Sequence, residues 1–111
     1  MATYVQKGES IDYTPGADVA AGDVVVQGDL VGVARTPIAA DTLGSLAVAG
    51  VFDFPKATGV GSGIAAGATC YWDAADGEAK TDDESGANER IGKAIQAAAD
   101  ADETVRIRMS Q

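Results

Sequence analysis

The longest run of apolar residues in the chain spans residues 44–56. One set of alternate positions holds Leu46, Val48, Gly50, Phe52 and Phe54, and the other holds Ser45, Ala47, Ala49, Val51 and Asp53. Both sets are largely apolar, which predicts a single strand covered on two faces rather than a half-exposed strand. Proline has no N–H to donate to a strand ladder, so Pro55 should mark the end of this strand.

Shorter segments with strand patterning flank this run on both sides. Residues 104–109 alternate cleanly, so Val105, Ile107 and Met109 should face a core while Arg106 and Arg108 face solvent. We expect the other strands near residues 4–6, 11–13, 24–26, 30–34, 69–72, 78–81 and 91–95. The pattern predicts an all-β fold, a compact small sandwich or barrel of short strands with little or no helix.

The connections between these segments have the composition of turns. The Gln27-Gly28-Asp29 sequence predicts a tight hairpin turn between two β-branched strands. Residues 57–67 are rich in glycine and alanine and should form a loop. Residues 97–102 have helical propensity but are too few for a stable isolated helix, so we expect one turn at most.

The chain also carries a weak internal repeat. Residues 19–26 resemble residues 64–71 at an offset of 45, whereas residues 31–34 resemble residues 91–94 at an offset of 60. The two offsets differ by 60 − 45 = 15, which predicts a 15-residue insertion in the second copy between Trp72 and Ile91.

This repeat suggests how the chain is divided. We expect an N-terminal arm and first strand at residues 1–13, and a single β domain at residues 14–111. Within that domain the pseudo-repeats cover about residues 19–50 and 64–110, and an acidic hairpin insertion covers residues 73–90. In the repeat, Leu46 and Val48 align with Arg106 and Arg108. The 44–56 segment therefore has an additional apolar face, which we expect to pack either in the core or against another subunit.

Composition narrows the classes of function. A chain of 111 residues fits one domain, and only six residues are Phe, Tyr or Trp, so we expect stabilisation by association with other subunits. The net charge of −9 argues against nucleic-acid binding and suits a basic partner, although salt adaptation is another source of acidity. We expect no membrane span and, from the opening Met1-Ala2-Thr3-Tyr4, no secretory signal.

Each candidate for chemistry has a simpler structural interpretation. The acidic cluster at residues 73–84 lacks the spacing of a calcium loop, and Cys70 has no histidine to activate it, because the chain contains none. Asp53 is interpreted as a strand-end residue or an interface pair. Residues 87–94 miss both the first glycine and the hydroxyl of a phosphate loop. We therefore expect no catalytic residue, metal site or cofactor.

The order of several short motifs resembles a known family. They are Tyr4-Val5-Gln6 with Gly8-Glu9, Ala21-Gly22-Asp23-Val24-Val25, Val31-Gly32-Val33-Ala34, Gly50-Val51-Phe52 with Pro55-Lys56, Cys70-Tyr71-Trp72-Asp73, Ile91-Gly92 with Ala94, and Val105-Arg106-Ile107-Arg108. Together they resemble the tailed-phage capsid cement (head decoration) family, some members of which carry a misleading recombinase label. The resemblance covers nearly the whole chain.

The resemblance implies a structural decoration protein on the outer surface of a phage head, made in the host cytoplasm and bound there as a homotrimer. Its partners would be the major capsid protein and other copies of itself, and it would stabilise the shell by bridging capsomers. The expected capsid contacts are Ala2, Thr3, Tyr4 and Val5 in the N-terminal arm. The expected subunit interface comprises Leu46, Val48, Phe52, Phe54 and Pro55. The alternative is a small β-rich surface module that binds carbohydrate or another ligand.

Overall fold

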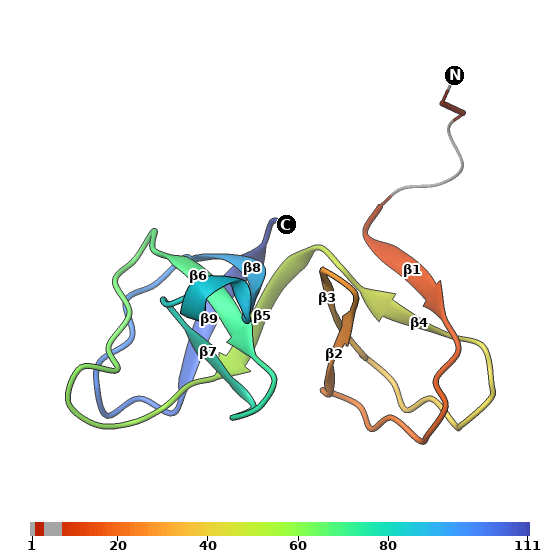
Figure 1. Cartoon of the computed structure of the whole chain (residues 1–111), viewed down its shortest axis with the longest axis horizontal. Helices are drawn as coiled ribbons and strands as arrows, with labels where there is room; N and C mark the ends of the chain where they lie inside the picture. The colour runs from red at the N-terminus through yellow and green to blue at the C-terminus, as the bar shows by residue number, and fades with distance from the viewer. Residues whose placement is uncertain (1, 4–7) are drawn as a thin grey trace.

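The computed structural model describes residues 2–3 and 8–111 and is all-β, which confirms the predicted fold class. Two antiparallel sheets lie side by side (Figure 1). The first sheet has the order β1-β4-β3-β2, with β1 at Ser10–Tyr13, β2 at Val24–Gln27, β3 at Leu30–Val33 and β4 at Gly44–Ala47. The second has the order β5-β9-β8-β6-β7, with β5 at Gly50–Pro55, β6 at Thr69–Asp73, β7 at Glu78–Lys80, β8 at Glu89–Ala94 and β9 at Thr104–Met109.

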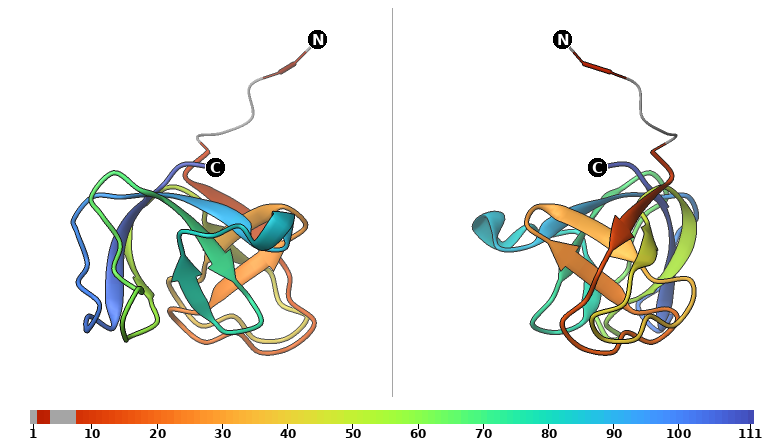
Figure 2. Two further views of the ribbon diagram at one scale, coloured as in Figure 1. Left: turned by 60° about the vertical axis from the view of Figure 1, so that its left-hand side comes forward. Right: turned by 90° about the vertical axis from the view of Figure 1, so that its right-hand side faces the viewer.

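Helix is almost absent from the described part of the chain. One short 3-10 helix, η1, covers Glu84–Gly86, and residues 97–102 hold a β-bridge at Ala98 and a turn at 100–101 rather than a helix. None of the described residues forms a helix that is long and apolar enough to cross a membrane. The loops around residues 14–23 and 36–43 and those around 57–63 and 97–103 lie at the end of the molecule opposite the C-terminus (Figures 1 and 2).

The prediction of one continuous strand over residues 44–56 is wrong. The segment forms two strands, β4 and β5, which belong to different sheets, so it is the link between the two halves of the molecule. The chain bends at residues 48–50, where Gly50 has φ 112°. Backbone in this region is strained for any residue with a Cβ atom, so glycine permits the change of direction. Pro55 ends β5, as predicted.

The two halves of the molecule contain corresponding backbone hydrogen bonds. The residues that form them are related by the same two offsets in residue number as the sequence repeat. In the first half Val19 and Ile38 exchange backbone hydrogen bonds of 2.8 and 2.9 Å, and Ile64 and Ala98 exchange bonds of 2.9 and 2.8 Å in the second. These positions are related by 64 − 19 = 45 and 98 − 38 = 60. The strand orders also correspond, since β1-β4-β3-β2 matches β5-β9-β8-β6 and β7 is the additional strand.

The main core lies between the sheets. It joins Val31 and Val33 of the first sheet to the inner face of the second sheet, where Phe54 and Trp72 pack with ring centroids 6.0 Å apart. The buried members on the second sheet include Cys70, Ile91, Ala94, Val105, Ile107 and Met109. Burial of Val105, Ile107 and Met109 with exposure of the intervening residues confirms the predicted alternation in β9.

A smaller cluster covers the opposite face of the first sheet. Ala34, Ile38 and Leu46 are buried there, with Ile11 and Val25 packed against them among other partly buried side chains. Leu46 is therefore a core residue where its counterpart Arg106 is exposed. The loops of the first half cover this face. At Leu46, therefore, the additional apolar face of the 44–56 segment is buried by the chain itself and needs no second subunit.

Two polar side chains tie distant segments together. Lys56 is buried, and its Nζ donates to the carbonyl oxygens of Ala57 at 2.7 Å and Asp102 at 2.9 Å. A bridge between Lys56 and Ala79 brings the two outer strands of the second sheet together. Gln111 donates to the Val31 carbonyl at 2.7 Å and accepts from the Val31 N–H at 2.6 Å, which holds the C-terminal end against β3.

We predict that Gly50→Ala lowers the free energy of unfolding by about 1–3 kcal/mol, because alanine must adopt a left-handed backbone conformation at the bend. Gly16→Ala is the matched control: a Cβ atom there would meet no atom within 4 Å. The control should change stability by about 0.5 kcal/mol or less, or raise it slightly. Urea denaturation measures both variants, and equal stabilities would contradict the role of Gly50.

Candidate functional site

The five residues predicted to form a subunit interface do not share one surface. Leu46 and Phe54 are each 1% exposed and belong to the core of the chain itself. Val48 and Phe52 are half-buried, and Pro55 is exposed. An interface built on this segment can therefore use Val48, Phe52 and Pro55 directly, whereas Leu46 and Phe54 support it from beneath.

The predicted capsid contacts fall at the beginning of the chain. Ala2 and Thr3 are exposed, which leaves both side chains accessible to a partner. Tyr4 and Val5 lie outside the described residues. The first strand, β1, is an edge strand of the first sheet, because among residues 2–3 and 8–111 it pairs with β4 alone. An edge strand presents backbone N–H and C=O groups that a further strand can pair with.

A hollow of about 450 Å³ lies where the chain crosses between the sheets. Its walls are Glu9, Ser10, Arg35, Ala47, Ala49, Gly50, Val51 and Phe52. Small apolar side chains form most of the wall on the β4–β5 side, and Glu9 and Arg35 supply one charge of each sign. The hollow therefore joins part of the predicted interface to the segment that enters β1, a combination suited to a protein contact.

The acidic insertion folds around one lysine. Lys80 Nζ lies 2.7 Å from Asp73 Oδ2 and 2.8 Å from Asp76 Oδ2, and the Asp76 N–H donates to Asp73 Oδ1 at 3.1 Å. These contacts, led by the hydrogen bond from Lys80, hold the pKa of Asp73 well below its usual range. The hydrogen bond to Asp73 in turn raises the pKa of Lys80. The cluster is thus an internally paired turn.

The following loop is held by Asn88, a buried residue. Its Nδ2 donates to the Asp82 carbonyl at 2.9 Å and to Glu84 Oε2 at 2.8 Å. The N–H of Glu84 also donates to the Asp82 side chain at 2.9 Å. Across the residues that the structure describes, no group of three or more His, Cys, Asp or Glu side chains is placed to hold a metal ion.

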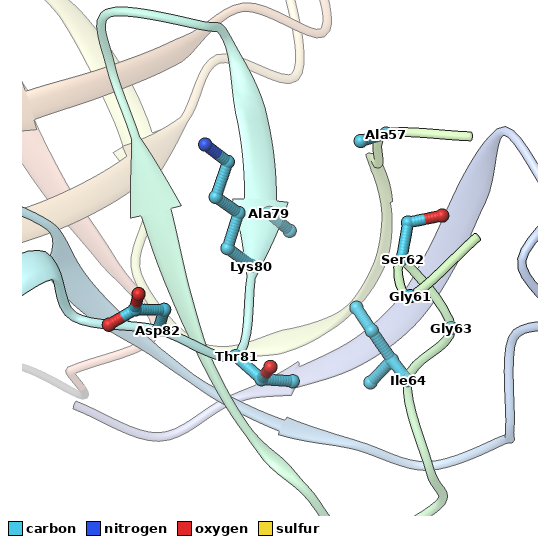
Figure 3. Close-up of a pocket in the computed structure, with 9 residues that line it drawn as sticks. All are labelled: Ala57, Gly61, Ser62, Gly63, Ile64, Ala79, Lys80, Thr81 and Asp82. Atoms are coloured by element: carbon cyan, nitrogen blue, oxygen red, sulfur yellow. The ribbon is translucent and has the colours of Figure 1, made fainter. Parts of the chain in front are cut away.

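A second hollow, of about 220 Å³, lies between β7 and the glycine-rich loop. Figure 3 shows Ser62 and Ile64 on the loop side and Ala79, Lys80 and Thr81 on the strand side. None of its nine lining residues is aromatic. Carbohydrate sites usually stack the sugar on an exposed aromatic ring, and Trp72 is buried in the core, so this hollow does not favour the alternative of a sugar-binding module.

The remaining candidate residues have structural roles. Cys70 is fully buried, and burial raises the pKa of its thiol, which makes it less nucleophilic. Asp53 is exposed and accepts hydrogen bonds from Arg106 Nε at 2.9 Å and Nη2 at 3.2 Å. The bond from Arg106 lowers the pKa of Asp53, which therefore belongs to a surface ion pair.

Sequence reasoning missed the residues that the crossover brings together. Glu9 and Arg35 lie far from Phe52 in the sequence and line the same hollow only because β4 and β5 part at the bend. No local pattern marks either residue. The buried role of Lys56 was missed as well, although its position just after Pro55, at the end of an apolar run, is a signal that could have suggested it.

Comparison with known protein families gives a match over nearly the whole chain. The model of the family described as phage cement protein matches residues 5–109 of the 111-residue chain. No curated protein and no solved structure matches the chain.

We predict that Asp73→Asn destabilises the fold most at neutral pH. A carboxyl whose folded-state pKa is depressed stabilises the protein above its ordinary pKa of 3.8, and this contribution is lost as pH falls through the lower folded-state value. The difference in unfolding free energy between wild type and variant should therefore shrink below pH 3.8. Urea denaturation from neutral to acidic pH measures it.

Asp29→Asn is the control for this experiment, because Asp29 is exposed in the β2–β3 turn. This change should cost little throughout the pH range. A difference between wild type and Asp73→Asn that stays constant in acid would contradict the importance of the Lys80 pair.

Proposed function

The chain belongs to the phage cement protein family, and on this premise we propose that it binds the outer surface of a phage head and stabilises the shell by bridging capsomers. The family is one of structural proteins, so the chain is a structural component of the virion that binds the phage capsid. Its partner in this proposal is the major capsid protein, and its action is mechanical rather than catalytic.

The observation that carries the proposal is the extent of the family match. Residues 5–109 include both sheets and the link between them. The family role therefore applies to the whole fold and does not rest on one local motif. A protein that bridges two capsomers needs two separated contact areas on a stiff body, and two sheets joined by a shared core and a short bend meet that need.

Weak individual contacts are sufficient for this role. A phage shell offers many identical sites, and a subunit that contacts more than one capsomer, or associates with other subunits, binds with an avidity well above that of each contact. The small apolar side chains around the 44–56 segment suit such modest contacts. We accordingly propose association as a homotrimer on the shell, with Val48, Phe52 and Pro55 at the contact between subunits.

A threefold ring requires two different surfaces on each subunit, because each copy contacts the next in a head-to-tail manner. The hollow beside Phe52 supplies one concave surface, and the exposed Pro55 lies at the other end of the same strand. The N-terminal residues 1–5 supply a further proposed contact, in which the arm binds the shell by adding a strand or extending along it.

We predict that the full-length protein co-sediments saturably with expanded, undecorated shells. Removing residues 1–5 should weaken this binding, by an amount that reports the contribution of the arm. Sedimentation of the two proteins with the same shells over a range of protein concentrations measures both affinities.

Two outcomes would count against the proposal. Failure of the full-length protein to bind shells would contradict the decoration function itself. Full binding by the shortened chain would leave decoration intact and exclude the arm as a capsid contact.

We predict that Val48→Arg reduces self-association on the shell, because a charge enters the proposed subunit contact. Leu43→Arg is the matched control, since Leu43 is also an apolar residue but is 67% exposed in a loop of the first sheet. Crosslinking of shell-bound protein followed by mass measurement distinguishes trimers from monomers. Normal trimers with a folded Val48→Arg variant would exclude this side of the segment as the interface.

A further inference from the structure

The positive charges of this acidic chain are concentrated on one face. The chain has eight Lys and Arg residues against seventeen Asp and Glu, and four of the eight lie on the neighbouring strands β8 and β9. They are Arg90, Lys93, Arg106 and Arg108, and all four are exposed. We call this set the basic face. The other charged residue of the two strands, Glu89, is half-buried opposite Trp72.

Strand register places these side chains on the same side of the sheet. Lys93 is directly opposite Arg108, and Arg108 is directly opposite Val51 of β5. Residues directly opposite each other in an antiparallel sheet point to the same face. The core lies on the other side, where Val105, Ile107 and Met109 are buried.

A β-bulge brings Arg90 onto this face. Arg90 and Lys93 are three positions apart, so strict alternation would point them to opposite sides. Cys70 pairs with Gly92, but the next residue, Tyr71, pairs with Arg90, so the register shifts by one residue. Ile91 is therefore the additional residue of β8, and it is buried in the core. The bulge thus adds a cation to the outer face. The first half shows no such shift between β2 and β3.

Most of this charge is not neutralised by residues that the structure describes. Arg106 pairs with Asp53, at 2.9 Å. Within the described residues no ion pair joins Arg90, Lys93 or Arg108 to a carboxylate. Lys93 and Arg108 are like charges directly opposite each other, an arrangement that destabilises an isolated sheet. The arrangement therefore does nothing for the stability of the free protein.

Apolar side chains border the basic face. Val51 of β5 is 50% exposed, and Ile95, which follows β8 and donates its N–H to the Arg106 carbonyl, is 45% exposed. They are two of the four large hydrophobic residues exposed in the described chain. Protein contact surfaces are enriched in arginine and combine apolar groups with a polar rim, and this face offers both kinds of group.

We propose that the basic face is the surface with which this protein docks onto an acidic patch of the capsid shell. The inference rests on the proposed function and assigns the orientation of the bound subunit. A chain with a net charge of −9 is repelled by an acidic surface unless it approaches with its positive side. The basic face therefore steers the subunit so that the outer side of β8 and β9 meets the shell.

Part of the chain's own acidity is already engaged within the fold. Asp73 and Asp76 are paired with Lys80. Asp100 and Asp102 accept hydrogen bonds from the backbone N–H groups of Gly63 and Ala99 at 2.7 and 2.8 Å. These four carboxylates hold their own loops and are therefore less available to a second copy.

The test compares shell binding by wild type with the double variant Lys93→Gln/Arg108→Gln. The variant should bind expanded, undecorated shells roughly tenfold more weakly, the effect of losing two modest ion pairs, and with a smaller dependence on salt concentration. Its melting temperature should equal or exceed that of wild type, because a like-charge pair is removed. Lys93→Arg/Arg108→Lys keeps the charge and should bind as wild type does.

Ala17→Glu/Gln27→Glu is the matched control, since it changes the net charge by the same two units at exposed positions of the first half. Equal weakening by this control would overturn the inference, because net charge alone would then explain the effect. Unchanged binding by the double variant would also overturn it. A double variant that binds shells normally but fails to self-associate would assign the face to contacts between copies. Failure of wild type to bind would instead overturn the proposed function.

Discussion

The bend at residues 48–50 is the constraint on which the rest of the structure depends. One apolar segment supplies β4 to the first sheet and β5 to the second, so only residues 48 and 49 separate the two sheets along the chain. Gly50, with φ 112°, makes the change of direction possible within three residues. The main core then joins both sheets through Val31, Val33 and the inner face of β9, and Gln111 closes the junction from the C-terminal end.

Much of the fold follows from local patterns in the sequence. The alternation in β9, the turn at Gly28-Asp29 and the burial of Cys70 were all predictable, because side-chain period and turn chemistry act over a few residues. The repeat offsets of 45 and 60 reappear in the backbone hydrogen bonds of Val19 with Ile38 and of Ile64 with Ala98. The weak sequence repeat therefore corresponds to a repeat in the backbone hydrogen bonds of the two halves.

The bend itself could not be predicted in the same way. A continuous apolar run looks the same in a straight strand with two covered faces as in two strands that enter different sheets. For the same reason the pattern predicts Leu46 and Phe54 at an interface, whereas both are buried within the chain, Leu46 in the smaller cluster and Phe54 in the main core. The basic face was equally hidden, because it depends on β8 lying beside β9 and on the bulge at Ile91.

The features together describe a cement protein with distinct sides. Many acidic residues lie in turns and loops, as in the Lys80 cluster, whereas four cationic residues lie on β8 and β9. The crossover hollow and the partly buried Val48 and Phe52 lie where the two halves meet. A two-sheet body that offers surfaces to the shell and to its own copies fits the proposed role of bridging capsomers.

Electron cryomicroscopy of expanded shells saturated with the protein is the most direct test of the proposal that it binds the outer surface and bridges capsomers. We expect additional density on the outer surface at positions shared by neighbouring capsomers, with the outer side of β8 and β9 against the shell. Density confined within single capsomers, or no additional density at saturating protein concentration, would contradict it.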